Sequence, residues 1–148
     1  MNWKYITESD EITLHDCVVT EWVFGENITL NFEDGFDVCA ANPLNDTGRH
    51  KRTGESAVIL KNAKFISGML YISKTEEKEL SESDFSELEI EILELKQTAD
   101  SAIFECDAWR TEHGDCFCEL KFKCENMIYC WNEFTDDAWF QDYPKGNV

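Results

Sequence analysis

Strict alternation between apolar and polar residues is the feature that most constrains what this chain can fold into. It is clearest at 116–124, where apolar residues such as Leu120 and Phe122 alternate with charged ones such as Lys121. Because successive side chains of a strand point to opposite faces of its sheet, a period of two is typical of half-buried strands. Several such segments predict a mainly β fold, an antiparallel β-sandwich or barrel-like sheet with little helix. With 148 residues we expect a single domain spanning 1–148.

Turn residues between these segments predict how the strands are connected. Asp34-Gly35 is a strong hairpin signal between the alternating runs 27–32 and 36–40. A second hairpin is expected at 98–100. Further strands are predicted at 12–24 (one or two strands), 57–60, 65–73, 101–108, 116–124 and 126–131.

The acidic segment 76–94 carries two competing patterns. Apolar residues at 88, 90 and 92 alternate with glutamates, as in a strand. The apolar residues at 85, 88, 92 and 95 also fit one face of a helix, with Ser81 or Ser83 as its N-cap. The β-branched isoleucines and the hairpin that follows favour a strand over 85–95, and the helix remains the alternative.

The charge balance predicts the class of partner. The chain has 31 acidic and 13 basic residues, a formal net charge of −18 at pH 7. Such a surface repels nucleic acid and anionic membranes, and it steers a basic protein toward itself. We therefore expect a basic protein partner, and no binding to nucleic acid or membrane. The charge leaves open whether the chain is a monomer or a small homo-oligomer.

The N-terminal residues predict the compartment. Residues 1–10 lack the continuous apolar core of a signal peptide, and no run approaches the roughly 18 apolar residues of a membrane span. A cytoplasmic location is therefore predicted, where thiols stay reduced. The seven cysteines agree with this, since a closed disulfide framework would leave one of them unpaired.

Metal and thiol chemistry each have candidate residues, and the surroundings argue against both. The cysteines at 116, 118, 124 and 130 could form a zinc site with His113, but structural zinc ligands come in close pairs on tight loops. Cysteines that alternate along a strand are more typical of a core. Cys17 lies two residues from His15, yet Asp16 and Glu21 would raise the pKa of its thiol. Phosphate-binding glycine motifs do not occur. The sequence predicts no enzyme activity, no metal site and no cofactor.

The longest polar stretch, 41–55, predicts a loop that carries the basic cluster Arg49-His50-Lys51-Arg52. This cluster could contact an anion or clamp an acidic patch of a partner. A solvated loop tip that balances local charge is the favoured interpretation, because exposed loops often carry such residues.

Two acidic groups are predicted to contact the partner. The predicted contact residues are Glu87, Glu89 and Glu91 of the acidic segment, and Asp136, Asp137, Trp139 and Asp142 near the C-terminus. Tryptophan is a frequent anchor of interfaces, and an acidic rim complements a basic partner. The three glutamates could instead form a solvated outer face that guards the sheet against edge pairing. Trp139 and Tyr143 could instead plug one end of the core, the role that we predict for Trp131.

In size, acidity and β pattern, the chain resembles the immunity proteins of bacterial polymorphic-toxin and contact-dependent growth-inhibition systems. Its ending, Trp131-Asn132-x-Phe134-x-x-Asp137-Ala138-Trp139-Phe140, is similar to the endings of small bacterial proteins of that kind. The resemblance implies a stoichiometric inhibitor that binds a cognate toxin domain, often a basic nuclease, and blocks its active site or substrate groove. It assigns no functional residue by motif.

Two other classes of function stay open on the sequence. The first is a small-molecule-binding or catalytic β-sandwich or barrel, with a pocket at one end that holds His15 or His113 among a few polar groups. The second is a subunit of a larger assembly, in which the aromatic C-terminal segment docks onto another copy.

Overall fold

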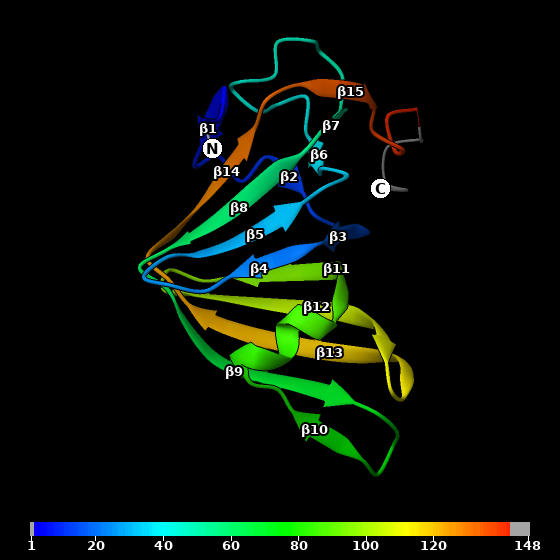
Figure 1. Ribbon diagram of the computed structural model, residues 1–148. Helices are drawn as coiled ribbons and strands as arrows, with labels where there is room; N and C mark the ends of the chain where they lie inside the picture. The colour runs from blue at the N-terminus through cyan, green and yellow to red at the C-terminus, as the bar shows by residue number, and fades with distance from the viewer. Residues whose placement is uncertain (1, 143–148) are drawn as a thin grey trace.

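The computed structural model describes residues 2–142, apart from the side chain of Arg110. These residues form three antiparallel sheets, none of which closes into a barrel (Figure 1). The mainly β, antiparallel fold expected from the alternation is therefore confirmed, with open sheets.

Each sheet combines strands from distant parts of the chain. The five-stranded sheet has the order β1 (Tyr5–Thr7), β14 (Asn126–Trp131), β8 (Ser56–Lys61), β5 (Ile28–Phe32) and β4 (Glu21–Val23). The six-stranded sheet has the order β10 (Glu77–Glu79), β9 (Lys64–Tyr71), β13 (Gly114–Lys123), β12 (Ser101–Thr111), β11 (Glu89–Gln97) and β3 (Cys17–Val19). The four-stranded sheet has the order β15 (Phe134–Asp137), β7 (Lys51–Thr53), β6 (Asp37–Val38) and β2 (Ile12–Thr13).

The two larger sheets meet where β3 runs into β4. Thr20, between these strands, donates to the carbonyl of Asn31 through both its amide (2.8 Å) and its hydroxyl (3.1 Å). This corner carries the chain from the six-stranded to the five-stranded sheet, so 12–24 forms three short strands where one or two were expected. In Figure 1 the strands of both sheets converge at the left of the view and spread apart to the right.

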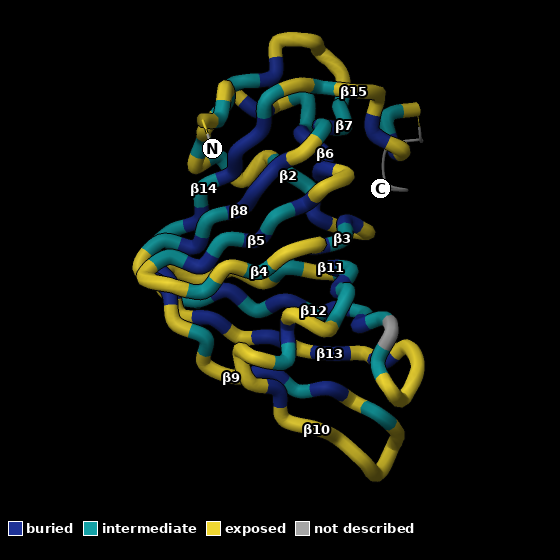
Figure 2. Tube along the Cα trace, viewed as in Figure 1, coloured by how far each residue is buried: buried dark blue, intermediate teal, exposed yellow. Residues whose placement is uncertain are grey.

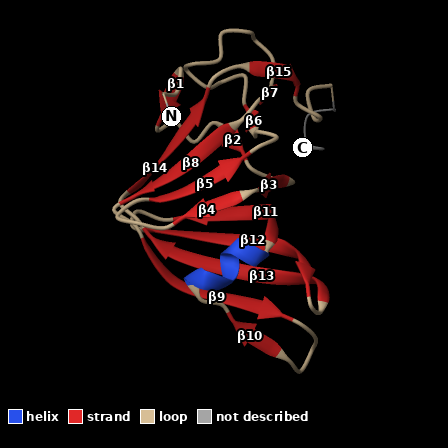
Figure 3. Cartoon of the chain, in the orientation of Figure 1, coloured by secondary structure: helices blue, strands red, loops and turns tan. Residues whose placement is uncertain are grey.

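The core lies between the larger sheets and is closed by the 3-10 helix η1 (Glu82–Glu87), which Figure 3 shows lying across β12 and β13. Phe85 of η1 is buried, and its ring lies 4.9 Å from that of Trp22 and 5.3 Å from those of Phe24 and Phe65. Burying several aromatic side chains together supplies much of the hydrophobic stabilisation of a domain this size. Figure 2 shows the contrast between this interior and β10, which is exposed along its whole length.

The hairpin predicted at Asp34-Gly35 is wrong. A turn does form, with Gly35 at φ +81° and its amide 3.2 Å from the carbonyl of Phe32, but β5 and β6 belong to different sheets. Thr53 is the reason: its hydroxyl accepts from the amide of Phe36 (3.1 Å), and its amide donates to the carbonyl of Phe36 (2.9 Å). These bonds direct the chain toward β7 instead of back along β5.

The loop predicted at 41–55 is partly wrong as well. Residues 51–53 form β7, which pairs with β6 and β15, and Ser56 begins β8. The remaining loop is held inward by buried Asn45, whose side-chain amide donates to the carbonyls of Val38, Cys39 and Arg49. Polar composition alone therefore did not distinguish an exposed loop from one whose side chains form hydrogen bonds in the interior of the protein.

The acidic segment contains both of the structures that competed for it. Residues 82–87 form η1, whereas 89–97 form β11, so the strand prediction is confirmed for 89–95 and wrong for 85–87. Ser81 precedes the helix, and its amide donates to the carboxylate of Asp84 at 2.8 Å. The hairpin predicted at 98–100 is confirmed, because β11 pairs with β12.

Candidate protein-binding surface

One continuous row of side chains crosses the outward face of the six-stranded sheet. Successive strand pairings place these residues opposite one another: Val18, Glu91, Asp107, Phe117, Tyr71 and Glu77. We call this set the outer row. It faces away from the core, because Ile90 and Ile92, on either side of Glu91 in β11, are fully buried at 0% exposure.

Two aromatic rings are exposed within the outer row. Phe117 is 41% and Tyr71 is 39% exposed, and their ring centroids lie 5.8 Å apart. Exposed aromatic side chains that support one another are typical anchors of protein interfaces. Sequence reasoning missed both. The available signal was Phe117 itself, an aromatic residue at an outward position between two core cysteines of the alternating run.

Carboxylates lie opposite carboxylates in the same sheet. Glu91 pairs across strands with Asp107, and in the neighbouring row Glu94, Glu105 and Glu119 lie opposite one another. Burial raises the pKa of Glu91, and the charges of Asp16 and Asp107 raise it further. Like charges directly opposite in a sheet cost stability, so this arrangement is not explained by the fold. Lys96 relieves part of the cost, since it bonds Glu105 at 2.9 Å.

A tight turn links the outer row to the C-terminal segment. The amide of Asp16, which has φ 63°, donates to the carbonyl of Ile92 at 2.8 Å. His15 Nδ1 bonds the carbonyl of Leu93 at 2.7 Å, and the His15 ring lies 6.4 Å from that of Trp139. The structure thus brings one residue from each predicted contact group, Glu91 and Trp139, to either side of this turn.

The C-terminal group is divided by its internal contacts. Asp137 bonds Arg49 (2.8 Å) and Lys51 (3.1 Å), and these bonds lower its pKa to about 2. Asp142 lies 3.6 Å from Arg49, with its side chain 86% exposed. Asp136 is exposed on β15, and Trp139 is 46% exposed. Asp137 therefore serves the fold, whereas Asp136 and Asp142 are exposed and Trp139 is nearly half exposed.

The aromatic residues near the C-terminus also divide. Trp131 is fully buried, as predicted, and Phe140 is buried beside His50 at 5.0 Å between ring centroids. Trp139 does not plug the core, because nearly half of it is exposed. Tyr143 lies outside the described residues.

The basic cluster is used within the chain. Arg49 and Lys51 hold Asp137, and Arg52 is half-buried, with Nη1 3.2 Å from Asp37 Oδ2 and 3.3 Å from Cys17 Sγ. The charge-balancing interpretation is confirmed, but the expected solvated loop tip is wrong for Lys51 and Arg52, which lie in β7.

Asp37 is the least expected residue of the fold. Its side chain is 0% exposed although the alternation placed it outward, and burial raises its pKa. Within the described residues, its Oδ1 atom has no hydrogen-bond partner. Burial also raises the pKa of the neighbouring Cys17 to about 12. A thiol with such a pKa is not a nucleophile near neutral pH.

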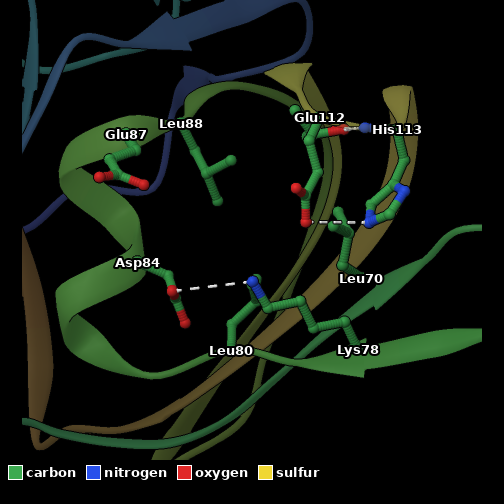
Figure 4. A pocket seen from close by; sticks show the side chains of 9 residues that line it. Leu70, Lys78, Leu80, Asp84, Glu87, Leu88, Glu112 and His113 are labelled. Carbon is green, nitrogen blue, oxygen red and sulfur yellow. Dashed lines mark hydrogen bonds and ion pairs between the residues drawn. The ribbon is translucent and has the colours of Figure 1, made fainter.

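Glu87 lies apart from the other two predicted glutamates. Glu89 and Glu91 belong to β11, with Glu89 opposite Trp109 in β12, whereas Glu87 lies in η1. There it lines a cleft of about 210 Å³ between η1, β10 and the β12–β13 hairpin (Figure 4). The residues that line it are Leu70, Lys78, Leu80, Asp84, Glu87, Leu88, Thr111, Glu112 and His113.

The described residues contain few other features that are typical of a metal-binding or reactive site. No group of three or more His, Cys, Asp or Glu among residues 2–142 could hold a metal ion, and all seven cysteines are free. Nor does this part of the chain contain a helix long and apolar enough to cross a membrane. Comparison with family models, curated proteins and solved structures finds no match for this chain.

Proposed function

We propose that this chain binds a basic protein partner in a one-to-one complex and neutralises it, as the immunity proteins that it resembles do. The observation that carries the proposal is the outer row, where opposed carboxylates stand beside two exposed aromatic rings. The resemblance to immunity proteins points to a toxin domain of the basic nuclease type as this partner.

Charge supports the proposal in two ways. A lysine or arginine placed between Glu91 and Asp107 would relieve a repulsion that the free protein maintains. The net charge of −18 would also accelerate the encounter with a basic domain, because long-range attraction raises association rates by one to three orders of magnitude.

Apolar contact supports it independently. Phe117 and Tyr71 supply rigid rings that lose little conformational entropy on binding, and the acids around them form a polar rim. Trp139, with Asp136 and Asp142 nearby in the chain, extends the surface beyond the turn at His15. We expect Asp137 to contribute less, since Arg49 and Lys51 already neutralise it.

Survival of a test bacterium is the first experiment. The product of the reading frame next to this one in the source genome is expressed with and without this chain, and survivors are counted. We expect the neighbour to kill and this chain alone to restore growth. A harmless neighbour, or equal killing in both strains, would contradict the proposal.

Binding kinetics with the partner then test the surface. We expect Glu91→Gln with Asp107→Asn to slow association about tenfold at low salt, because two steering charges are lost from the contact. The control, Glu33→Gln with Glu55→Gln, removes two exposed acids that lie outside the outer row, and should change the rate by less than about twofold. Equal effects of both pairs would show that only net charge matters.

The aromatic pair is tested through dissociation. Phe117→Ser with Tyr71→Ser should weaken the complex by about 2 kcal/mol or more, mainly by faster dissociation. Ile6→Ser with Val23→Ser is the matched control, since these residues are 58% and 46% exposed on the outward face of the five-stranded sheet. If Ile6→Ser with Val23→Ser weakened binding as much, the partner would instead occupy the outward face of the five-stranded sheet.

A small-molecule-binding or catalytic domain is the second candidate. The observation that favours it is that His113 and His15, the two histidines expected in a pocket, each line a cavity, of about 210 and 360 Å³. Only the second reaches the 300–1,000 Å³ typical of small-molecule sites. A thermal-shift screen against metabolites and divalent metals tests it, and stabilisation by any of them would favour this candidate over the first.

A further inference from the structure

We infer that the cleft beneath η1 receives an arginine side chain of the protein partner. The inference rests on the proposed function for the basic character of that partner. The cleft lies on the inner side of the six-stranded sheet, so the partner would reach it from the outer row around β10, whose Glu77 belongs to the outer row and whose Lys78 lines the cleft. Three apolar side chains, Leu70, Leu80 and Leu88, stand in the cleft together with the carboxylates of Asp84, Glu87 and Glu112. A long basic side chain has the matching chemistry, an apolar stem with a cationic head.

The apolar part of the cleft is its floor. Leu70 is 3% and Leu80 is 4% exposed, so both are anchored in the core, and Leu88 is half-buried at the end of η1. Leucine at these positions is fixed by packing on the inner face of the six-stranded sheet, where Leu70 lies opposite Cys118. An inserted methylene chain would therefore meet a rigid apolar surface.

The carboxylates approach the opening from two sides. Figure 4 shows Asp84 and Glu87 on η1, facing Glu112 and His113 on the β12–β13 hairpin, with Lys78 of β10 between them. Glu87 is exposed. The side chain of Glu112 is 76% exposed, although its Oε1 already lies 3.2 Å from His113 Nε2, so both carboxylates keep surface open to a ligand.

The cation already in the cleft does not neutralise it. Lys78 Nζ lies 4.0 Å from Asp84 Oδ1, the outer limit of an ion pair. Hydrogen bonds from Ser81 hold Asp84 in place and lower its pKa, so this carboxylate is ionised at neutral pH. With Glu87 and Glu112 added, the negative charges outnumber the lysine.

Size and geometry favour one arginine. A volume of about 210 Å³ is below the range of drug-sized ligands, whereas it suits a single long side chain. Carboxylates on opposite sides of the opening suit the planar guanidinium, which presents five donors in a fixed fork, better than the point charge of lysine.

The cleft is tested without the partner, by NMR titration of the ¹⁵N-labelled full chain. The probe is N-acetyl-arginine N-methylamide, compared with the norleucine analogue, which has a stem without charge, and with guanidinium chloride, which has charge without a stem. We expect amide shift changes gathered at 78–88 and 111–114 for the arginine probe, and binding at least fivefold weaker for either partial probe. Shifts spread over all acidic surfaces, or equal binding of guanidinium, would overturn the inference.

A charge-matched variant pair completes the experiment. Glu87→Gln with Glu112→Gln should abolish the localised shifts, whereas Glu33→Gln with Glu55→Gln should leave them unchanged. Failure of the two proposals can be distinguished. If the partner binds and the Glu87/Glu112 variant binds it equally well, the cleft inference fails and the proposed function stands. If the cleft binds arginine and no basic partner is neutralised, the proposed function fails alone.

Discussion

The four-stranded sheet and the six-stranded sheet use charge in opposite ways. In the first, Arg49 and Lys51 hold Asp137, and Arg52 holds buried Asp37. In the second, carboxylates face one another across strands, in the outer row and in the row beside it. Nearly all of the basic cluster 49–52 thus neutralises acids of the small four-stranded sheet. The repulsion between the opposed carboxylates of the six-stranded sheet is left largely uncompensated.

Strand length explains why the fold tolerates this difference. Strands of the four-stranded sheet are 2–4 residues long, too short to bury much apolar surface, so ion pairs add to the hydrogen bonds of Thr53 and Asn45 in holding them. Strands β11, β12 and β13 are 9, 11 and 10 residues long, and their inner faces pack a continuous core. That core offsets a repulsion worth a few tenths of a kcal/mol per pair. The opposed carboxylates of the six-stranded sheet do not stabilise the fold, so they are available to contact a partner.

The largest effect is expected from breaking the buried pair. Arg52→Met leaves Asp37 buried without its counter-ion, and we expect the free energy of unfolding to fall by about 3 kcal/mol in urea denaturation. Combining it with Asp37→Asn should restore part of this loss, because no charge then remains buried. If Arg52→Met alone lowered the free energy of unfolding by less than about 1 kcal/mol, the four-stranded sheet would not depend on the Arg52–Asp37 pair.

A smaller effect, with a defined pH dependence, is expected at Asp137. Its pKa of about 2 lies below the ordinary value of 3.8, so its bonds to Arg49 and Lys51 stabilise the fold above about pH 4. This stabilisation is lost as the pH falls through 2. Asp137→Asn should lower the melting temperature at pH 7 by much less than Arg52→Met does, and the difference from the parent should shrink as the pH falls through 2 and vanish below it. A difference independent of pH would contradict the ion-pair explanation.

The smallest effect, and the opposite sign, is expected at Glu91. Its pKa is raised, so the ionised side chain costs stability above that pKa, and the cost disappears once the group is protonated. Glu91→Gln should therefore stabilise the protein at pH 7 by a few tenths of a kcal/mol, and the gain should disappear once the pH falls below the ordinary pKa of 4.5. Added salt should stabilise the parent more than the variant, since only the parent has the Glu91–Asp107 repulsion to screen. Destabilisation at pH 7 would remove the contrast between the two sheets.

Local pattern predicted the elements well where burial on one face decided the structure. The alternation at 116–124 placed Cys116, Cys118 and Cys124 in the core, and all three are buried in or just after β13. It failed where long-range contacts decide. Asp34-Gly35 forms a turn as its sequence indicates, but Thr53 determines where that turn leads. Asp37 is buried beside Arg52, fifteen residues along the chain, whose Nη1 lies 3.2 Å from Asp37 Oδ2.

The predicted contact residues show the same limit. Their acidity was visible in the sequence, but whether an acid is already paired depends on which strand lies beside it. Nothing local separates Asp136, exposed on its strand, from Asp137, which is bonded to Arg49 and Lys51. Glu87 and Glu89 are two residues apart, yet the change from η1 to β11 sends one to the cleft and leaves the other on the sheet.

The sequence by itself determined the class of fold, the core cysteines and the acidic character of the surface, because periodicity and composition act residue by residue. Tertiary structure alone decided which carboxylates are opposed, which are neutralised and which line the cleft with Leu70 and Leu80. Electrostatic energy depends on the distance between charges, and in an antiparallel fold those distances are set by register and strand order, which no local pattern contains.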